Sequence, residues 1–472
     1  MKKLFNRVVD GSVALVNRFL PDAFVLAIIL TIIVFIIAIP VTGVAPAEGV
    51  SVFDRFVNLI YDGWFGGFWN LLAFSMQMAL IVVTGSVFAN APPIHRFIVR
   101  IASVAKTPKQ AVLLVALIGM ITYFIQWGAA MIICAILAKE VAKRVKGVHY
   151  PLLVAAAYLG NGLWHGGISG TIPLNLAGGW TFEGMWSTTG IPFSQTVFAP
   201  YNLFIYIVGA IVLCLLITAM HPSPDKTITI DPAIVAEDEV KEPPLPPKSE
   251  MSFAERLENS RLLNWIIVLI GFVCIVWSFV DMLWIQKTGF SLSINLVNFI
   301  FLFLSIAMYG TPIKVVRAIN VAVRGVGGIL LQFPFYAGIA GLMGYAGGST
   351  GQSIAQVIAQ FFVNISNDFT FPLFTFISSG IVKLFVPSGG AHWTVQGPIV
   401  MSAAQSFLDS VSEGKAAMSL AWGNCWGNLL QPFWLLPVLD VAKLKIRDVM
   451  GYCVICLIAL FFVILIGLCI PG

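Results

Sequence analysis

Polar side chains that could bind a small ion or anion interrupt the apolar stretches of this 472-residue chain. At the interruptions they are amides, hydroxyls, imidazoles and one lysine, and carboxylates are missing. A helix that breaks at membrane depth directs its N-terminal dipole and free N–H groups at an anion, while unwound carbonyl groups coordinate a cation. These residue types therefore favour a site for a small anion that moves together with a cation.

Two overlapping sets of residues are candidates for this site. Ser388, Gly389 and Gly390 are central to it, because glycines without a Cβ let the backbone turn sharply and approach an anion closely. We expect the substrate site to comprise Trp127, Gly128, Asn161, His165, Lys383, Ser388, Gly389, Gly390, His392 and Asn424. We expect the ligands of a coupling ion among Gln126, Asn161, Ser169, Asn424 and Asn428.

Each candidate also has a purely structural interpretation. An amide or hydroxyl in a broken helix can bond to a neighbouring helix, and His165 and His392 can be structural donors as well as proton carriers. Lys383 lies five residues before Ser388 and therefore well below the outer surface, where a charged group is costly and suggests function. The alternative is that Lys383 extends outward to the interface or pairs with Asp368.

The stretch Phe385-Val-Pro-Ser-Gly-Gly-Ala-His-Trp393 separates two apolar runs, 371–384 and 395–404. Each run is too short to cross about 30 Å of hydrocarbon alone, so we predict a re-entrant hairpin over 371–406. Irregular backbone at this depth is tolerated where it lines a cavity or is buried in protein, so the break is a candidate binding site. A spanning helix that kinks at Pro387 is the alternative.

A break of the same shape, Gln126-Trp-Gly, predicts a first re-entrant hairpin over 110–145. Each hairpin precedes an apolar segment with glycine and asparagine interruptions, 150–177 and 416–442. Paired interrupted segments in corresponding positions of two halves are typical of secondary transporters. We therefore predict an inverted repeat. Its parts are a first repeat over residues 1–220, a polar and partly disordered cytoplasmic linker over 221–258, and a second repeat over 259–472.

The composition defines the class of protein. With 58% hydrophobic and 10% charged residues, the chain is predicted to be an all-α polytopic membrane protein. All but four of the 27 Lys and Arg residues fall on one side of the predicted topology. This bias places the N-terminus in the cytoplasm, the C-terminus outside and the two hairpins on opposite faces. The net charge of +5 reports on topology and indicates no nucleic-acid partner.

Four longer motifs point to a family. They are Trp69-Asn-Leu-Leu-Ala-Phe-Ser-Met-Gln-Met-Ala-Leu-Ile-Val-Val-Thr-Gly85, Leu331-Gln-Phe-Pro-Phe-Tyr-Ala-Gly338, Val386-Pro-Ser-Gly-Gly-Ala-His-Trp-Thr-Val-Gln-Gly-Pro398 and Gln431-Pro-Phe-Trp-Leu-Leu-Pro437. Together they resemble the short-chain fatty acid transporter (AtoE) family nearly end to end. The resemblance implies uptake of short monocarboxylates such as acetoacetate and butyrate across the bacterial inner membrane.

The same resemblance implies kinship with the ion-transporter superfamily of two-hairpin elevator carriers, which are often homodimers. Relatives in that superfamily carry Ser-Asn-Thr at their hairpin tips and use sodium. This chain departs from them, since it has Gln126-Trp-Gly and Ser388-Gly-Gly at the corresponding breaks.

Other functions compete with this interpretation. An intramembrane enzyme would need a His-Glu-x-x-His motif or paired acids in the apolar segments, and the chain has neither. A channel does not need matched hairpins, and a dicarboxylate carrier would also direct its substrate at helix N-termini; the scarcity of intramembrane positive charge favours a monoanion. We expect no cofactor beyond a coupling ion, where the lack of an acidic relay favours Na⁺ and His165 and His392 leave H⁺ open.

Overall fold

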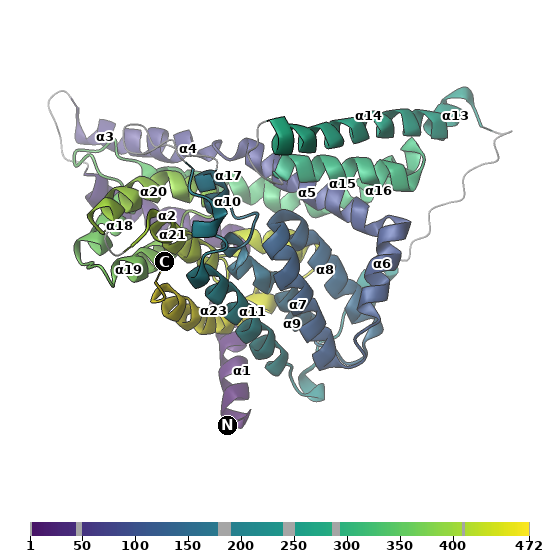
Figure 1. The fold of residues 1–472 in the computed structure, drawn as a ribbon, viewed down its shortest axis with the longest axis horizontal. Helices are drawn as coiled ribbons and strands as arrows, with labels where there is room; N and C mark the ends of the chain where they lie inside the picture. Colours follow the sequence, from purple (N-terminus) through teal and green to yellow (C-terminus); the bar gives the residue numbers. More distant parts are fainter. Residues whose placement is uncertain are drawn as a thin grey trace.

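The computed structural model describes residues 2–43, 50–177, 190–238, 251–285, 293–407 and 411–471, which are almost entirely helical (Figure 1). Seven helical stretches among them are long and apolar enough to cross a membrane. They contain α2 (Ala23–Thr42), α5 (Leu72–Asn90), α7 (Pro108–Ile125), α11 (Pro200–Ala219), α14 (Arg261–Val280), α17 (Gly327–Gly344) and α23 (Ile446–Leu468). The prediction of a polytopic helical membrane protein is therefore confirmed at the level of class.

Shorter helices connect or cover these long ones. They are α1 (Lys2–Phe19), α3 (Val52–Asn58), α4 (Gly66–Phe68), α6 (Pro92–Ala102), α12 (Pro232–Asp238), α13 (Phe253–Glu258), α15 (Ile294–Tyr309), α16 (Pro312–Ala322) and α18 (Ile354–Asn364). The amphipathic α1 packs along α23, where Ser12 Oγ donates to the Gly451 carbonyl oxygen at 2.9 Å. In Figure 1, α14–α16 lie toward one end of the molecule and α18–α20 toward the other.

Two pairs of helices fold back on themselves where hairpins were predicted. In hairpin 1, formed by α7 and α8 (Trp127–Arg144), Thr122 Oγ1 lies 3.2 Å from Cys134 Sγ. A straight helix would separate residues twelve positions apart by about 18 Å. In hairpin 2, formed by α19 (Phe371–Lys383) and α20 (Gly389–Ala404), Gln396 Nε2 donates to Ser378 Oγ at 2.8 Å. That these hairpins enter the membrane from opposite faces stays a prediction.

Two interrupted helices follow the hairpins. The first consists of α9 (Tyr150–Tyr158), 3₁₀ turns at Leu159–Gly162 and Trp164–Gly166, and α10 (Thr171–Ala177). The second consists of α21 (Glu413–Gly427), a 3₁₀ turn at Pro432–Trp434, and α22 (Leu436–Ala442). The order hairpin, interrupted helix and long helix therefore occurs twice, from α7 to α11 and from α19 to α23, as the predicted repeat requires; its inverted symmetry stays a prediction.

Close packing of α19 on α21 positions hairpin 2. A Cβ on Gly423 would lie 2.3 Å from the Phe376 carbonyl oxygen, and one on Gly427 would lie 2.6 Å from Lys383 Cγ. Glycines four residues apart on one helix face let the neighbouring backbone approach. Ser379 Oγ then donates across the contact to the Leu420 carbonyl oxygen at 2.6 Å. This packing seats Lys383 directly against α21.

Residues 52–68 are helical and lead into α5, although they contain three glycines. A Cβ on Gly67 would lie 2.7 Å from Gly341 Cα in α17. The absence of side chains lets the two helices approach closely, and this tertiary packing outweighs the low helix propensity of glycine.

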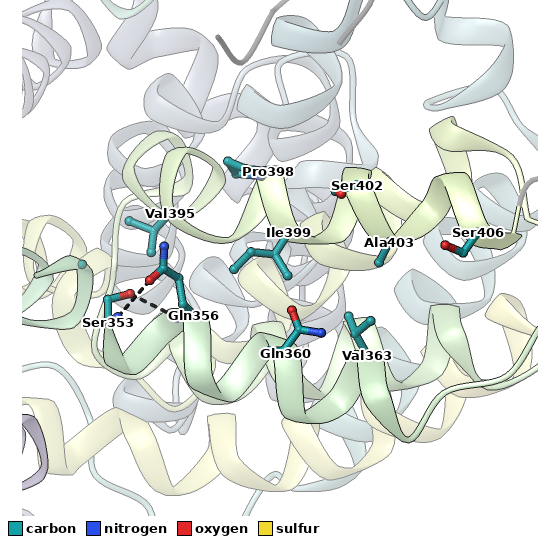
Figure 2. A pocket seen from close by; sticks show the side chains of 11 residues that line it. Ser353, Gln356, Gln360, Val363, Val395, Pro398, Ile399, Ser402, Ala403 and Ser406 are labelled. Carbon is teal, nitrogen blue, oxygen red and sulfur yellow. Dashed lines mark hydrogen bonds between the residues drawn. The ribbon is translucent and has the colours of Figure 1, made fainter. Parts of the chain in front are cut away.

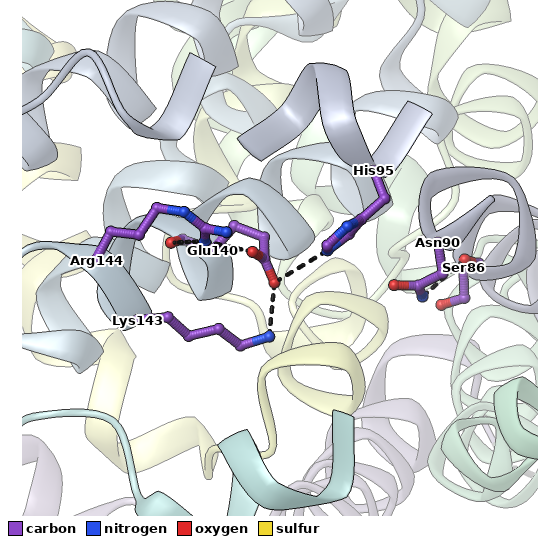
Figure 3. A network of polar contacts seen from close by, with 6 residues as sticks. All are labelled: Ser86, Asn90, His95, Glu140, Lys143 and Arg144. Carbon is purple, nitrogen blue, oxygen red and sulfur yellow. Dashed lines mark hydrogen bonds and ion pairs between the residues drawn. The ribbon is translucent and has the colours of Figure 1, made fainter. Parts of the chain in front are cut away.

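A charged cluster ties the base of hairpin 1 to the amphipathic α6 (Figure 3). Glu140 is buried and bonds to Lys143 Nζ at 2.6 Å and to Arg144 on the same helix. His95 Nε2 of α6 lies 3.5 Å from the same carboxylate. The basic residues that end hairpin 1 therefore neutralise a buried acid.

The first part of the predicted linker packs on the protein. The Ile228 N–H donates to His149 Nδ1 at 2.9 Å, and the Tyr150 N–H donates to the Ile228 carbonyl oxygen at 2.8 Å. Lys226 pairs with Asp10 of α1 at 2.7 Å. Burial lowers the pKa of His149, which precedes α9, to about 4. Residues 239–250 of the linker lie outside the described residues.

Candidate functional site

The tip of hairpin 2, residues 384–390, joins the C-terminus of α19 to the N-terminus of α20. Ser388 is the N-cap of α20, and its Oγ accepts a long 3.4 Å hydrogen bond from the Ala391 N–H. Gly389 and Gly390 are the first residues of α20 and neither has a positive φ. The turn therefore does not require the left-handed backbone that only glycine adopts readily. That these glycines let the backbone approach an anion stays a prediction.

Gly389 lies against His165 of the first interrupted helix. A Cβ on Gly389 would lie 2.9 Å from His165 Nε2 and 3.1 Å from its Cε1. A Cβ on Gly390 would have no neighbour closer than 4.0 Å. The two adjacent glycines are therefore not equivalent: Gly389 is needed for contact between hairpin 2 and the first interrupted helix, whereas Gly390 has room for a side chain.

Lys383 is fully buried at the same tip. Its Nζ donates to the Pro387 carbonyl oxygen, which also accepts from Trp434 Nε1 at 2.9 Å. The Trp434 ring centre is 5.7 Å from the ammonium nitrogen. Among the described residues no acidic side chain pairs with Lys383, so the interpretations as an outward-extended lysine or a partner of Asp368 are both wrong. Lys383 is therefore a buried amine without an acidic partner among the described residues.

A chain of buried hydrogen bonds extends from His165 into hairpin 2. His165 Nε2 lies 3.1 Å from Asn424 Oδ1, and Asn424 Nδ2 lies 2.8 Å from His392 Nδ1. His392 Nε2 lies 2.6 Å from Gln396 Oε1, and the amide of Gln396 donates to Ser378 as described above. Since an amide nitrogen can only donate, His392 accepts at Nδ1 and donates from Nε2. The chain joins both arms of hairpin 2 to both interrupted helices.

Two features at this tip favour a negative charge. Lys383 lies within electrostatic range of both His165 and His392, and the N-terminus of α20 adds the partial positive charge of its helix dipole. A carboxylate placed between Lys383 and the start of α20 would meet both features. Neutral His165 donates from Nε2 to the Asn424 amide oxygen, so its Nδ1, which is buried without a hydrogen-bond partner among the described residues, is an acceptor.

Three tryptophans form an apolar wall beside the lysine. The ring centres of Trp127 and Trp434 are 4.8 Å apart, those of Trp127 and Trp164 are 5.0 Å apart, and Phe74 lies 5.7 Å from Trp434. Each tryptophan comes from a different element: hairpin 1, the first interrupted helix and the second. Trp434 is not among the site residues predicted from the sequence. The motif that contains it, Gln431-Pro-Phe-Trp, follows the second interruption and could have indicated it.

The tip of hairpin 1 is capped by its own neighbours. Gln126 Oε1 accepts from the Ala129 N–H at 2.7 Å, and Ser169 Oγ accepts from the Trp127 N–H at 3.1 Å. A Cβ on Gly128 would lie 3.0 Å from Ile81 of α5. Side chains therefore already satisfy donors at the start of α8, which makes this tip less suited to an anion than the tip of hairpin 2.

The predicted ion ligands lie in three separate contacts. Gln126 and Ser169 belong to the tip of hairpin 1, while Asn424 bonds to the two histidines. Asn161 instead meets Asn428, whose Nδ2 donates to Asn161 Oδ1 at 2.5 Å. Asn161 Nδ2 and Asn428 Oδ1 are buried without partners among the described residues. The structure thus pairs Asn161 with Asn428 and not with Asn424.

A cavity of about 630 Å³ lies on another face of hairpin 2, between α18 and α20 (Figure 2). Gln356 and Gln360 of α18 face Val395, Ile399 and Ser402 of α20 across it. Neither Lys383 nor the residues of the tip line this cavity.

Comparison with known proteins assigns the family of this polytopic membrane protein. A sequence profile described as "Short chain fatty acid transporter" matches residues 4–470. A protein of Haemophilus influenzae is 41% identical over 98% of this chain and 99% of its own, and one of Escherichia coli is 39% identical over the same shares. Both carry the name "Putative short-chain fatty acid transporter". The chain belongs to the short-chain fatty acid transporter family, which confirms the resemblance seen in its motifs.

A solved structure also aligns with the chain. The Alcanivorax borkumensis YdaH transporter covers 95% of this chain and 97% of its own, with 14% sequence identity and a TM-score of 0.43. At this score the likeness carries no conclusion about the site or its mechanism.

Proposed function

We propose that this protein is a secondary active transporter that takes up short-chain monocarboxylates, such as butyrate and acetoacetate, by cation symport across the bacterial inner membrane. The observation that carries the proposal is Lys383, a fully buried lysine without an acidic partner among the described residues. A buried charge is stable only when it is paired and hydrogen-bonded. The substrate carboxylate supplies that partner.

In the proposed complex the carboxylate lies at the tip of hairpin 2. Lys383 Nζ and the N-terminal turn of α20 at Ser388 and Gly389 hold its oxygens. The alkyl chain lies against the tryptophan wall of Trp127, Trp164 and Trp434. A single lysine balances one negative charge, so a monoanion fits this site and a dicarboxylate would leave one carboxylate buried without a counter-ion.

Access to the site requires movement, because Lys383, His165 and His392 are all fully buried in this conformation. We propose that the two hairpins are re-entrant and that transport follows an elevator mechanism, as the family resemblance implies. The contacts of hairpin 2 with both interrupted helices would let these elements move as one body. A homodimer, a cytoplasmic N-terminus and an outer C-terminus complete the proposed arrangement.

Uptake by proteoliposomes tests this function. Purified protein reconstituted with labelled butyrate, acetoacetate or succinate outside should take up the two monocarboxylates in preference to succinate when a cation gradient is imposed. Liposomes without protein measure the passive flux of the uncharged acids and are subtracted. Protein-dependent uptake of succinate but not of butyrate would replace the proposal with a dicarboxylate carrier, and uptake that persists with every gradient collapsed would indicate a channel.

A further inference from the structure

The surroundings of Lys383 indicate which ion is transported with the substrate, in addition to how the substrate is held. A protonated lysine has three N–H donors and no acceptor. In this structure Nζ has one acceptor among the described residues, the Pro387 carbonyl oxygen, and shares it with Trp434. The Trp434 ring face at 5.7 Å is the other group that favours the charge. The described residues therefore satisfy a neutral amine at Nζ and leave an ammonium short of acceptors.

The titratable groups around Lys383 do not compensate for this deficit. His392 of α20 and His165 of the first interrupted helix are within electrostatic range, and both would add positive charge if protonated. Cys425 of α21 is the remaining titratable group that acts on the lysine. Neither the tip, α20 nor α21 brings an Asp or Glu to Nζ within the described residues. An ammonium at Lys383 with no carboxylate beside it would thus be buried and unpaired.

We infer that Lys383 carries the coupling proton, so that the transporter moves one H⁺ with each monocarboxylate. In the empty carrier Lys383 is a neutral amine. On the side of uptake the amine takes a proton from solution, and the resulting ammonium pairs with the entering carboxylate, whose two oxygens are the acceptors that the site lacks. On the other side the carboxylate leaves and the proton returns to solution. One cation and one monoanion cross together, so the cycle moves no net charge.

This inference rests on the proposed function and selects H⁺ over the Na⁺ that the sequence alone favoured. The predicted ion ligands lie in three separate contacts in the described structure, which gives Na⁺ no single cage of oxygens. Proton release from Lys383 also explains how the carrier can return across the membrane without substrate, since a permanently charged lysine without a partner would be costly to move.

The test separates carboxylate binding from proton coupling in the same proteoliposomes. Exchange of internal unlabelled butyrate for external labelled butyrate at equal pH on both sides reports binding and movement of the loaded carrier. Net uptake driven by an imposed pH gradient or by an imposed Na⁺ gradient reports coupling, with protein-free liposomes as the blank. We expect the wild-type protein to exchange butyrate, to respond to the pH gradient, and to respond neither to Na⁺ nor to membrane potential.

Two substitutions sharpen the test. Lys383→Arg keeps a permanent positive charge that cannot be released, so exchange should continue while pH-driven net uptake falls to the level of the blank. Lys383→Met should lose both butyrate exchange and pH-driven net uptake. Lys415→Met is the matched control, because Lys415 is also buried but donates to the Ile470 carbonyl oxygen at 2.7 Å in another region, and it should keep both activities.

Each result decides between the claims. Butyrate exchange with net uptake that follows Na⁺ and ignores pH would overturn the inference and leave the proposed function standing, as would pH-driven net uptake by Lys383→Arg. Absence of protein-dependent butyrate exchange in the wild type would overturn the proposed function itself. The wild-type experiment needs no variant, so a misfolded substitution does not rescue the inference.

Discussion

Replacement of Gly389 by alanine should damage the tip of hairpin 2, while the same change at Gly390 should not. The new methyl at position 389 would lie 2.9 Å from His165 Nε2, a distance that forces the imidazole to move. The bond from His165 to Asn424 would then break and leave a buried amide oxygen without its donor. Such a loss costs about 1–3 kcal/mol, or roughly 5- to 150-fold in apparent affinity if binding requires the closed tip.

At position 390 the new methyl meets only ordinary contacts at 4.0 Å. Alanine also restricts the unfolded chain, which stabilises a helix by about 0.4–1 kcal/mol at a compatible position. The assay is the concentration dependence of labelled butyrate exchange in proteoliposomes, with detergent-extracted yield and monodispersity as the check on folding. Equal losses in Gly389→Ala and Gly390→Ala, or unchanged affinity in both, would refute the claim that contact with His165 defines the site.

Three further predictions follow from other contacts. Asn424→Leu removes the acceptor itself, so adding Gly389→Ala to it should reduce exchange little further, whereas multiplied losses would show that the two changes act on different interactions. Cysteines placed at the outer ends of α7 and α8 should react with an impermeant reagent from one side of the membrane, and those at the outer ends of α19 and α20 from the other; reaction of the two ends of one hairpin from different sides would make its helices spanning ones. The pKa of His149 is lowered to about 4, below the value of about 6.5 in an exposed chain. When the linker segment at Ile228 leaves His149 and the imidazole becomes exposed, it therefore binds a proton more readily between about pH 4 and about pH 6.5. The contact between the linker and His149 weakens as pH falls below about 6.5. Amide exchange at Ile228 should therefore show a lower protection factor at pH 5 than at pH 7, and equal protection would contradict it.

The sequence predicted the elements of the site because their signals are local. Glycine and proline between short apolar runs break a helix wherever the runs are placed, and the structure has helix ends at all four predicted breaks. The depth of Lys383 also followed from counting residues along its helix. The lack of an acidic partner for Lys383 could not be predicted, because it depends on which side chains the second interrupted helix brings to the tip.

The pairing of polar groups could not be predicted, because it depends on contacts across more than 250 residues. Asn161 and Asn424 occupy similar places in the two repeats, which suggested a shared role. In the fold, packing shifts the second interrupted helix so that Asn428 meets Asn161 and Asn424 meets the histidines. Residues 52–68 show the same limit: glycine has a low helix propensity, and the contact that accommodates Gly67 in a helix comes from α17.

Direct binding of labelled butyrate to the purified protein tests the central claim that Lys383 holds the substrate carboxylate. Scintillation proximity measurements on the wild type, Lys383→Met and Lys415→Met compare two buried lysines that differ in whether they lie at the tip of hairpin 2. The account predicts saturable binding in the wild type and in Lys415→Met, competition by acetoacetate but not by succinate, and loss of binding in Lys383→Met. Butyrate binding by well-folded Lys383→Met with the affinity of the wild type would contradict it.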